Sequence, residues 1–481
     1  MSARHTSTTR RRPSPYAHLR TRPGRLVAGA LATMLALALL TPLRDGGDRP
    51  AADLPSADLT AAAASGNRPT PGNFTGYGFD QCLTPTQAKM NVWMEHSPFM
   101  SVGIYISGNS RACRNQPNLT PTWVTNQLAR GWRLLPITLG PQASCSTRYP
   151  KYRDDPTISA DPTDSYAKAH AQGTLEANRA VAAAGRLGIV RGSTLFYDLE
   201  AFDITNTRCR VSAIRFVHSW TKRLREVGYK SGFYSSAGSG IKMLDDVRRS
   251  EPGKFALPDQ LWVARWDGQA NTSVDTKYLS AGAWLPGRRV KQYQGGHNET
   301  WGGVTINIDR NWLGLGPGIV APTETHCGGV KVDLARYRAL KPATATYKPA
   351  PELVKALQCL LKERGYRASV TGVYDAATQR AAGQWQKNRG FAVSTGWSVR
   401  DWMTLVSLGS KPTLKIGSTG VYVRRAQRAL RAAMPTAGVT INGKYDGAMA
   451  QHVKTYRERV RLTSGGVLNT DTWTLLQKGK F

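Results

Sequence analysis

Eight short apolar segments between residues 75 and 310 constrain the fold of this chain more than any other feature. Each is bounded by glycine, proline or polar residues, as β-strands usually are. They are Gly76–Cys82, Ser101–Ser107, Trp132–Leu139, Thr194–Leu199, Ser231–Tyr234, Leu261–Trp266, Val290–Tyr293 and Val304–Ile308. Helical periodicity fills several gaps, notably Ser165–Leu187 and Val211–Val227, which end at Gly188 and Gly228. This alternation predicts a (β/α)8-type TIM barrel, with an incomplete ring of helices beside the last three strands.

Four carboxylates stand at the ends of these predicted strands. Asp80 ends the first strand, Asp198 and Glu200 end the fourth, and Asp309 ends the eighth. Asp198 and Glu200 are two residues apart, so in a strand they point the same way, about 7 Å apart. Because the carboxyl ends of barrel strands meet at one mouth, we expect all four acids to gather there. Two carboxyl groups in different surroundings, one protonated and one ionised, are what glycosidic-bond hydrolysis requires.

Other side chains on or beside the same strands predict a sugar-binding cleft. Aromatic rings can stack on the apolar faces of sugars, although a single aromatic more often packs in the core. Gln292 and Gln294 alternate with Tyr293, so either the glutamines or the tyrosine should face the mouth. The predicted substrate-binding residues are Tyr105, Tyr234, Trp266, Gln292, Gln294 and Asn311.

The N-terminal part of the chain predicts export. Seven arginines fall within the first 25 residues, and residues 26–40 form an apolar run that ends at Thr41 and Pro42. A run of this length is typical of a signal-peptide core and is short for a membrane span. We therefore expect residues 1–65 to be a signal peptide with a flexible leader. An uncleaved anchor is the alternative, and in either case the membrane is met only through this segment.

The charge of the chain predicts a polyanionic partner. Its net charge is +33, from 65 Lys and Arg against 32 Asp and Glu. A field of this sign attracts polyanions. Because export is expected, the predicted partners are peptidoglycan and anionic polymers of the cell wall rather than nucleic acid. We expect a secreted monomer associated with the wall.

The six cysteines predict three disulfide bonds, since an even number in an exported chain usually pairs fully. Six cysteines allow fifteen pairings, and pairing in chain order gives Cys82–Cys113, Cys145–Cys209 and Cys327–Cys359. No Cys-x-x-Cys or His-Glu-x-x-His spacing is present, so neither a metal nor a cofactor is predicted.

Residues 352–481 contain an internal repeat. Each copy begins with an amphipathic helix and continues with a Gly-x-Tyr-Asp turn that ends at Asp375 or Asp446. An aromatic residue follows ten positions after each aspartate, and a tryptophan follows 27 positions after it; these residues are Trp385, Tyr456, Trp402 and Trp473. Such equal offsets predict two small three-helix domains, residues 351–409 and 410–481.

Residues 319–350, between barrel and repeats, are rich in threonine and proline and are predicted to be a linker. One short helix is expected within it, over Val332–Leu340, and Cys327 is expected to tie it down. In the second repeat a cluster of arginines is expected to face acidic wall polymers or solvent. These arginines are Arg424, Arg425, Arg428 and Arg431.

The barrel motifs resemble the glycoside hydrolase-like domain of exported actinobacterial proteins, over roughly residues 74–316. The motifs are Gly78-Phe79-Asp80, Tyr197-Asp198-Leu199-Glu200, Gln292-Tyr293-Gln294 and Ile308-Asp309-Arg310-Asn311. That family is similar in turn to the Chalaropsis-type lysozymes, which are retaining muramidases. The resemblance implies that Glu200 is the general acid and that Asp198 supports attack by the substrate's own N-acetyl group. Asp80 and Asp309 would flank that centre.

Arg310 departs from the family pattern. In the family the last motif runs Asp-x-Asn within a different loop context, whereas here Arg310 stands between Asp309 and Asn311-Trp312. A guanidinium beside Asp309 would either lower the pKa of that carboxyl group or block the cleft.

The C-terminal repeats resemble the three-helix peptidoglycan-binding domain. Its opening signature is found in the second copy, over Gly417–Gln427, whereas the first copy lacks the Gly-Ser-x-Gly lead. Together the two resemblances predict a glycoside hydrolase-like protein of residues 66–318, held on the wall by two binding repeats. The expected activity is hydrolysis of peptidoglycan glycan strands. The alternative is a non-catalytic protein that uses the barrel cleft as a glycan receptor.

Overall fold

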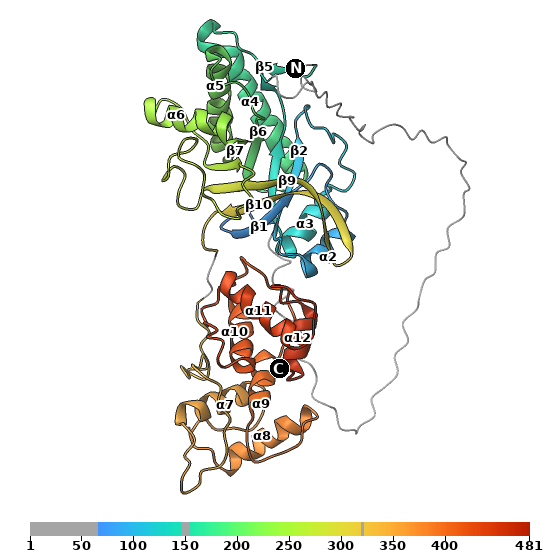
Figure 1. Ribbon diagram of the computed structural model, residues 1–481, viewed down its shortest axis with the longest axis vertical. Coiled ribbons are helices and arrows are strands. Elements are labelled where there is room, and N and C mark those ends of the chain that lie inside the picture. Colours follow the sequence, from blue (N-terminus) through green and yellow to red (C-terminus); the bar gives the residue numbers. More distant parts are fainter. Residues whose placement is uncertain (1–65, 147–153, 319–321) are drawn as a thin grey trace, which may run out of the picture. The chain divides into compact units, whose positions relative to one another are not determined.

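The computed structural model of this chain describes residues 66–146, 154–318 and 322–481 (Figure 1). Its N-terminal part is a closed barrel in the order β1-β10-β9-β8-β7-β6-β3-β2. The barrel strands are β1 (Thr75–Asp80), β2 (Ser101–Ser107), β3 (Arg133–Thr138), β6 (Thr194–Asp198), β7 (Lys230–Ser236), β8 (Gln260–Ala264), β9 (Arg289–Trp301) and β10 (Val304–Gly314). All eight predicted strands are thereby confirmed. The predicted leader, residues 1–65, lies outside the described residues.

Helices connect the first six barrel strands, whereas no helix connects β8 to β9 or β9 to β10, as the sequence predicts. Between β1 and β8 lie α2 (Gln87–His96), α3 (Pro121–Ala129), α4 (Thr163–Arg186), α5 (Thr207–Glu226), the π-helical turn η2 (Ala237–Ile241) and α6 (Lys242–Ser250). Polar side chains start several of them: Thr86, Thr120 and Asn206 each accept a hydrogen bond from a backbone N–H of the first turn. Within the described ranges, no helix is both long and apolar enough to cross a bilayer.

The direction of the last strand differs from that in an all-parallel TIM barrel. β9 and β10 form a hairpin through Gly302 and Gly303, whose positive φ angles of 57° and 78° suit a tight two-residue turn. β10 therefore pairs antiparallel with both β9 and β1, whereas the other barrel pairs are parallel. Asp309 consequently lies in the middle of β10 and not at its end. It still reaches the mouth, because it is the direct partner of Asp80 across β1 and β10.

The inside of the barrel is filled below its mouth. Alternate strand residues, among them Ile137, Phe196 and Val290, form a buried apolar cluster with Trp262. The other alternate residues pack between the strands and the helices in a separate cluster. The Trp262 indole N–H donates to Asn311 Oδ1 at 2.8 Å, which joins this apolar floor to the polar groups above it.

All three predicted disulfide bonds are confirmed. Cys82 pairs with Cys113, Cys145 with Cys209, and Cys327 with Cys359. The first connects the loops after β1 and β2, the second ties the loop after the third barrel strand to the first turn of α5, and the third ties residue 327 to the first helix after the barrel. No described cysteine is free.

Each C-terminal repeat has three helices. They are α7 (Pro351–Glu363), α8 (Ala376–Asn388) and α9 (Val399–Ser407) in the first copy, and α10 (Val421–Ala433), α11 (Gly447–Arg459) and α12 (Thr470–Gln477) in the second. The repeated aspartates cap α8 and α11, since Asp375 and Asp446 each accept from a backbone N–H three residues later.

One buried glutamine holds the Gly-x-Tyr-Asp turn in each copy. Gln358 Oε1 accepts from the backbone N–H groups of Thr371 and Gly372, both at 2.9 Å. Gln427 Oε1 does the same for Asn442 and Gly443, at 3.0 and 2.9 Å. The two glutamines therefore have equivalent structural roles, which supports the internal repeat.

We expect Gln427→Ala to lower the free energy of unfolding by about 2 to 3 kcal/mol, because two buried backbone donors lose their acceptor. Denaturant unfolding followed by tryptophan fluorescence measures this change. Gln384→Ala, on the exposed face of α8, is the matched control and should change stability by less than about 0.5 kcal/mol. Equal stabilities of the two variants would contradict the role assigned to Gln427.

The predicted helix over Val332–Leu340 is wrong. This segment is extended, and its apolar side chains at Val332, Leu334, Tyr337 and Leu340 are buried in the same core as the repeats. Leu340 pairs antiparallel with Trp397, and Leu414 pairs equivalently with Leu468 in the second copy. The spacing of these apolar residues suggested one face of a helix. Instead they pack against the repeats from an extended backbone, and Leu340 at its end forms backbone hydrogen bonds with Trp397.

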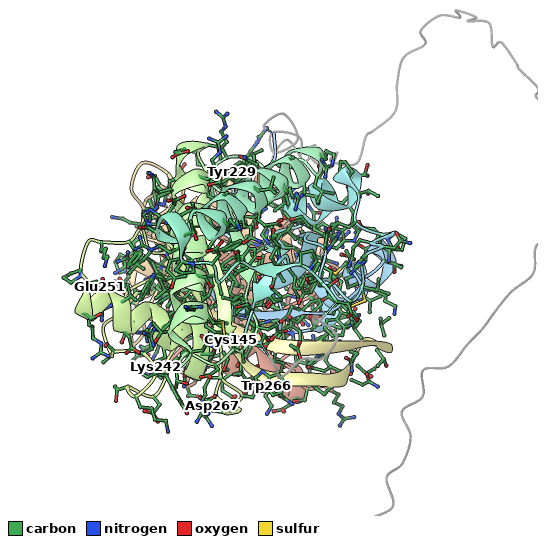
Figure 2. The ribbon with its side chains drawn as sticks, turned by 90° about the horizontal axis from the view of Figure 1, so that it is seen from above. Cys145, Tyr229, Lys242, Glu251, Trp266 and Asp267 are labelled. Atoms are coloured by element: carbon green, nitrogen blue, oxygen red, sulfur yellow. A yellow bond between two sulfur atoms is a disulfide. The ribbon has the colours of Figure 1, made fainter. Side chains whose placement is uncertain are left out.

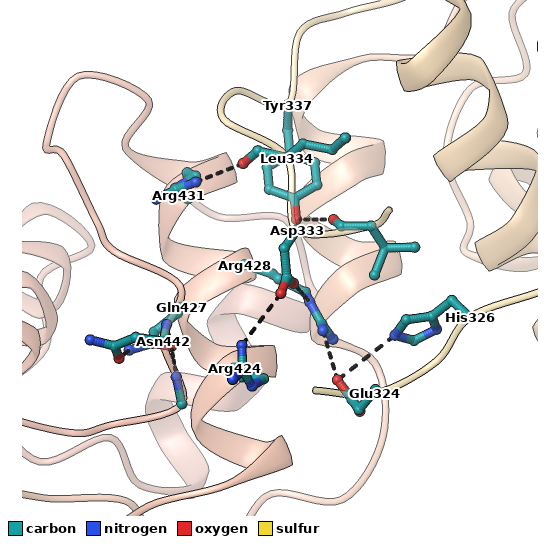
Figure 3. A network of polar contacts seen from close by, with 12 residues as sticks. Glu324, His326, Asp333, Leu334, Tyr337, Arg424, Gln427, Arg428, Arg431 and Asn442 are labelled. Atoms are coloured by element: carbon teal, nitrogen blue, oxygen red, sulfur yellow. Dashed lines mark hydrogen bonds and ion pairs between the residues drawn. The ribbon is translucent and has the colours of Figure 1, made fainter. Parts of the chain in front are cut away.

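The expectation that the arginines of α10 face polymer or solvent is also wrong (Figure 3). Arg428 donates to Asp333 at 2.5 Å and to Glu324 at 2.6 Å, and only 6% of its side chain is exposed. Arg424 pairs with Asp333 at 3.5 Å, and Arg431 donates to the Leu334 carbonyl at 2.8 Å. Arg425 stacks on Trp473, 4.4 Å from the ring centre. These side chains bind the segment before α7, or their own repeat, instead of an external polymer.

Candidate active site

The loop after β6 is held by one buried glutamine. Gln142, in the short strand β4 (Gln142–Ala143), donates to the Asp198 carbonyl at 2.9 Å and accepts from the Glu200 N–H at 2.8 Å. This amide therefore fixes the backbone on both sides of Leu199. Sequence reasoning missed Gln142, although its position just after the third strand is a signal for a residue near the mouth.

Asp80 lies at the centre of a buried hydrogen-bond network. Its side chain accepts from Asn311 Nδ2 at 2.6 Å and from Gln292 Nε2 at 3.1 Å. Gln292 Oε1 in turn accepts from the hydroxyl of Tyr234 and the indole N–H of Trp266, both at 2.9 Å. The orientation of the Gln292 amide is thus set by two donors on one side and a carboxyl group on the other.

Asp80 and Asp309 form a carboxyl pair with raised pKa values. Burial raises the pKa of Asp80 far above its usual range, and the charge of Asp309 raises it further. The pKa of Asp309 rises to about 6, through burial and then the charge of Glu200. We infer that the pair holds a proton at mildly acidic pH, because two carboxylates in contact cannot both ionise cheaply.

The four predicted acids come together around Tyr105. Burial raises the pKa of this phenol, and the charges of Asp198, Asp80, Glu200 and Asp309 raise it further. The Tyr105 hydroxyl donates to Asp198 Oδ2 at 3.4 Å, and Asp198 itself is only 2% exposed. The structure therefore gathers the four carboxyl groups that sequence places on three separate strands.

Two cavities meet at Glu200. One has a volume of about 240 Å³ and is also lined by Asp80, Tyr105, Arg111 and Asp309. The other has a volume of about 290 Å³, and its other lining residues include Tyr234, Arg265, Trp266 and Tyr278. Arg111, Arg265 and Tyr278 were not predicted, because they belong to loops whose course no strand pattern reveals. Glu200 alone lines both cavities.

Trp266 offers an open aromatic face at this mouth. It follows β8 and lies beside Asp267 in Figure 2, and 65% of the residue is exposed. Its ring covers Gly295, where a Cβ atom would stand 2.6 Å from the indole. An exposed indole fixed by a hydrogen bond to Gln292 is a suitable surface for an apolar sugar face.

Gln294 does not join the acids through any hydrogen bond of the described residues. Its Oε1 accepts from Arg310 at 3.4 Å. The pairing of β10 with β9 is irregular on both sides of Arg310, so the simple alternation from Gln292 to Gln294 is broken. The predicted partnership of the two glutamines in one site is therefore not supported by these contacts.

Arg310 neither pairs with Asp309 nor lines the two cavities. Its guanidinium forms two hydrogen bonds of 2.8 Å to the carboxylate of Glu299 on β9. The expectation that Arg310 lowers the pKa of Asp309 or blocks the cleft is wrong, since the pKa of Asp309 is raised. The physical reason is that the Glu299 carboxylate, on the paired strand, binds the arginine.

The raised pKa of Asp309 predicts a pH-dependent stability. The folded state binds this proton more tightly than the unfolded chain, so the free energy of unfolding falls as pH rises from about 4 to about 7. Asp309→Asn removes this contribution and should stabilise the protein at pH 7 by on the order of 2 kcal/mol, with little change at pH 4. Urea unfolding across this pH range checks the difference. Asp471→Asn, at an exposed acid, is the control, and identical pH profiles for Asp309→Asn and wild type would contradict the prediction.

Among the described residues, a group with metal-ligand geometry is formed by Cys327, Cys359 and Glu363. The two cysteines form a disulfide bond and so offer no thiolate. This group therefore does not fit a metal ion.

Comparison with known families places two domains in the chain. Residues 91–313 match the family described as the Rv2525c-like, glycoside hydrolase-like domain, and residues 351–396 match the peptidoglycan binding domain. The first match includes Asp198, Glu200 and Asp309. The second falls on the first repeat, the copy that lacks the Gly-Ser-x-Gly lead. No curated protein matches the chain.

Solved structures that match this chain cover about half of it. An uncharacterised protein of B. stearothermophilus is 19% identical, with 49% of this chain and 95% of that chain covered and a TM-score of 0.31. The Tat-secreted protein Rv2525c of Mycobacterium tuberculosis, in complex with L-tartrate, is 11% identical, with 50% and 95% covered and a TM-score of 0.32. A family 25 glycosyl hydrolase from Bacillus anthracis is 11% identical, with 52% and 93% covered and a TM-score of 0.30.

Proposed function

We propose that this chain, which carries an Rv2525c-like glycoside hydrolase-like domain and a peptidoglycan-binding domain, hydrolyses the glycan strands of peptidoglycan outside the cell. The proposed activity is that of an N-acetylmuramidase. One observation carries the proposal: Glu200 lies where two cavities meet, in a mouth that holds three further carboxyl groups. A glycan strand lying along both cavities would present a glycosidic bond to Glu200.

In the proposed reaction Glu200 donates its proton to the leaving glycosidic oxygen. The acetamide oxygen of the substrate attacks the anomeric carbon as the glycosidic bond breaks. Asp198, held by Tyr105, orients the acetamide and stabilises its developing positive charge. Water then attacks the anomeric carbon, and the Glu200 carboxylate takes up its proton, which restores the acid.

The Asp80 and Asp309 pair is proposed to bind sugar hydroxyls beside this centre. Because the pair shares a proton, it adds less negative charge to the mouth than two carboxylates would. It can both donate and accept a hydrogen bond, as a hydroxyl requires. Gln292 and Asn311 hold Asp80 in place for this role.

The helical repeats are proposed to hold the barrel on its insoluble substrate. Tethering raises the local concentration of the barrel beside the glycan without any new contact at the mouth. We propose that the mature protein is an exported monomer bound to the wall, and that residues 1–65 direct this export.

Digestion of purified peptidoglycan tests the proposed function. The mature protein is incubated with the polymer, the released fragments are reduced, and mass spectrometry identifies the sugar at each reducing end. A muramidase leaves muramic acid there. Fragments ending in N-acetylglucosamine, or no fragments at all, would contradict the proposal.

A further inference from the structure

A basic groove in the helical part is separate from the barrel mouth. It has a volume of about 550 Å³ and lies between the extended segment before α7 and the start of that helix. Four of its lining residues are cations, namely Lys331, Arg336, Arg338 and Lys348, whereas Glu352 is its one acid. All four cations are exposed. We call these four residues the groove cations.

The groove cations are available to a ligand, unlike the arginines of α10. Within the described ranges none of the four forms an ion pair, and two carboxylates nearby in sequence are bound elsewhere. Asp333 binds Arg424 and Arg428, and Glu324 binds Arg428 (Figure 3). The arginines of α10 therefore bind these two carboxylates, and among the residues that line the groove Glu352 offsets one of the four positive charges.

The groove is built on a rigid base. Leu334 and Leu353 line it and are 4% and 8% exposed, so its floor belongs to the core of the repeats. The extended segment that carries three of the cations is fixed by the Leu340–Trp397 bridge and by a hydrogen bond of 2.8 Å from Trp402 to the Arg338 carbonyl. Their backbone positions are thus set before any ligand binds.

We propose that this groove binds a phosphodiester-linked anionic polymer attached to the cell wall. Cations along a fixed groove match phosphates repeated along a flexible chain, and the net charge of +33 attracts such a chain from solution. Single-stranded nucleic acid is disfavoured, because its binding sites combine cations with open aromatic rings for base stacking. The one aromatic in this groove, Tyr347, is covered by Lys341, whose ammonium lies 4.9 Å from the ring centre.

Binding of the mature protein to poly(glycerol phosphate) tests this site. The groove variant carries Lys331→Gln, Arg336→Gln, Arg338→Gln and Lys348→Gln. The matched control carries Lys362→Gln, Arg367→Gln, Arg380→Gln and Lys387→Gln, four exposed cations of the first repeat that do not line the groove. Both variants lose four positive charges, so a general effect of net charge would weaken them equally.

We expect the wild type and the control to bind the polymer alike and the groove variant to bind at least about tenfold more weakly. The slope of log affinity against log salt should be shallower by about 3 in the groove variant, since each phosphate contact contributes about 0.7. Equal affinities of the two variants would overturn the proposal, as would tighter binding of wild type to single-stranded DNA than to poly(glycerol phosphate). If the groove variant has a lower melting temperature than the wild type, the double variant Arg336→Gln/Lys348→Gln replaces it in the binding test. The expected change in the salt slope is then about half as large.

This site does not depend on the proposed hydrolysis. Peptidoglycan freed of its phosphodiester polymers should bind the groove variant and the wild type equally. The groove variant should also digest that stripped wall as the wild type does. Failure of the barrel to cleave glycan would leave the polymer binding unchanged, and loss of polymer binding would leave the cleavage of stripped wall unchanged.

Discussion

Glu200→Gln is expected to lower the rate of peptidoglycan cleavage by about 10²- to 10⁴-fold, the contribution usual for a positioned general acid. Glutamine keeps the volume and hydrogen-bonding capacity of the side chain but cannot release a proton. The leaving sugar oxygen would then depart as an unprotonated alkoxide, which is a poor leaving group. Release of soluble muramic-acid reducing ends from purified wall measures the rate.

Binding should survive this substitution. The aromatic face of Trp266 and the repeats do not depend on the charge of Glu200, so sedimentation of the variant with insoluble wall should match that of wild type. Glu176→Gln is the control, because Glu176 is another buried glutamate of the barrel and lines neither cavity. It should retain wild-type activity.

Two results would contradict the proposed roles. Wild-type activity in Glu200→Gln would mean that another group supplies the proton. Binding by wild type and variant without any cleavage would favour the alternative, a glycan receptor in which the acids bind sugar hydroxyls and no bond is broken.

Most barrel strands could be predicted because they are buried on both faces and read as short apolar runs. In β10 buried residues alternate with exposed or half-buried ones, so its apolar residues marked a strand but did not by themselves give its direction. The pair Gly302-Gly303 was the available signal, because adjacent glycines between two strands are typical of a hairpin. With that signal, Asp309 would have been placed opposite Asp80 in the middle of a strand.

The acids of the site could be predicted from the sequence, but the side chains that hold them in position could not. Asp198 ends β6 and Glu200 follows it by two positions, so the chain itself keeps these two acids near each other. Gln142 fixes them from 56 or more residues away, through the short strand β4, which no apolar run in the sequence indicates. Arg310 pairs with Glu299, which lies 11 positions earlier in the sequence. The irregular pairing of β9 and β10 around Arg310 breaks the alternation that was expected for Gln294.

In the helical part, the local sequence pattern did not predict which charged side chains are exposed and which form internal ion pairs. The arginines of α10 looked like a solvated face because their partners, Asp333 and Glu324, precede them by about 100 positions. Both of these acids lie in residues 319–350, the segment that was predicted to be a linker. The cations of the groove, by contrast, were unremarkable in sequence and became a candidate site only through the fold.

Arg428→Ala is expected to destabilise the helical part by about 3 to 5 kcal/mol, the usual cost of removing one member of a buried charge network. Arg428 is 6% exposed and binds both Asp333 and Glu324, which are 21% and 30% exposed. Without the arginine, Asp333 keeps only Arg424 at 3.5 Å. Denaturant unfolding of the oxidised protein measures the loss, and Arg459→Ala, at an exposed position of α11, is the control.

The loss should grow as pH rises from 6, because His326 loses its positive charge as pH passes its raised pKa. Hydrogen bonds to Glu324 and Glu363 raise the pKa of His326, so its positive charge stabilises the fold at low pH. That contribution is lost as pH rises through the raised pKa. Below that pKa the imidazolium can still neutralise Glu324 in the variant, whereas above it the carboxylate loses this charged partner. A loss below about 1 kcal/mol at every pH would mean that water replaces the guanidinium, and that the extended segment is held by its apolar residues alone.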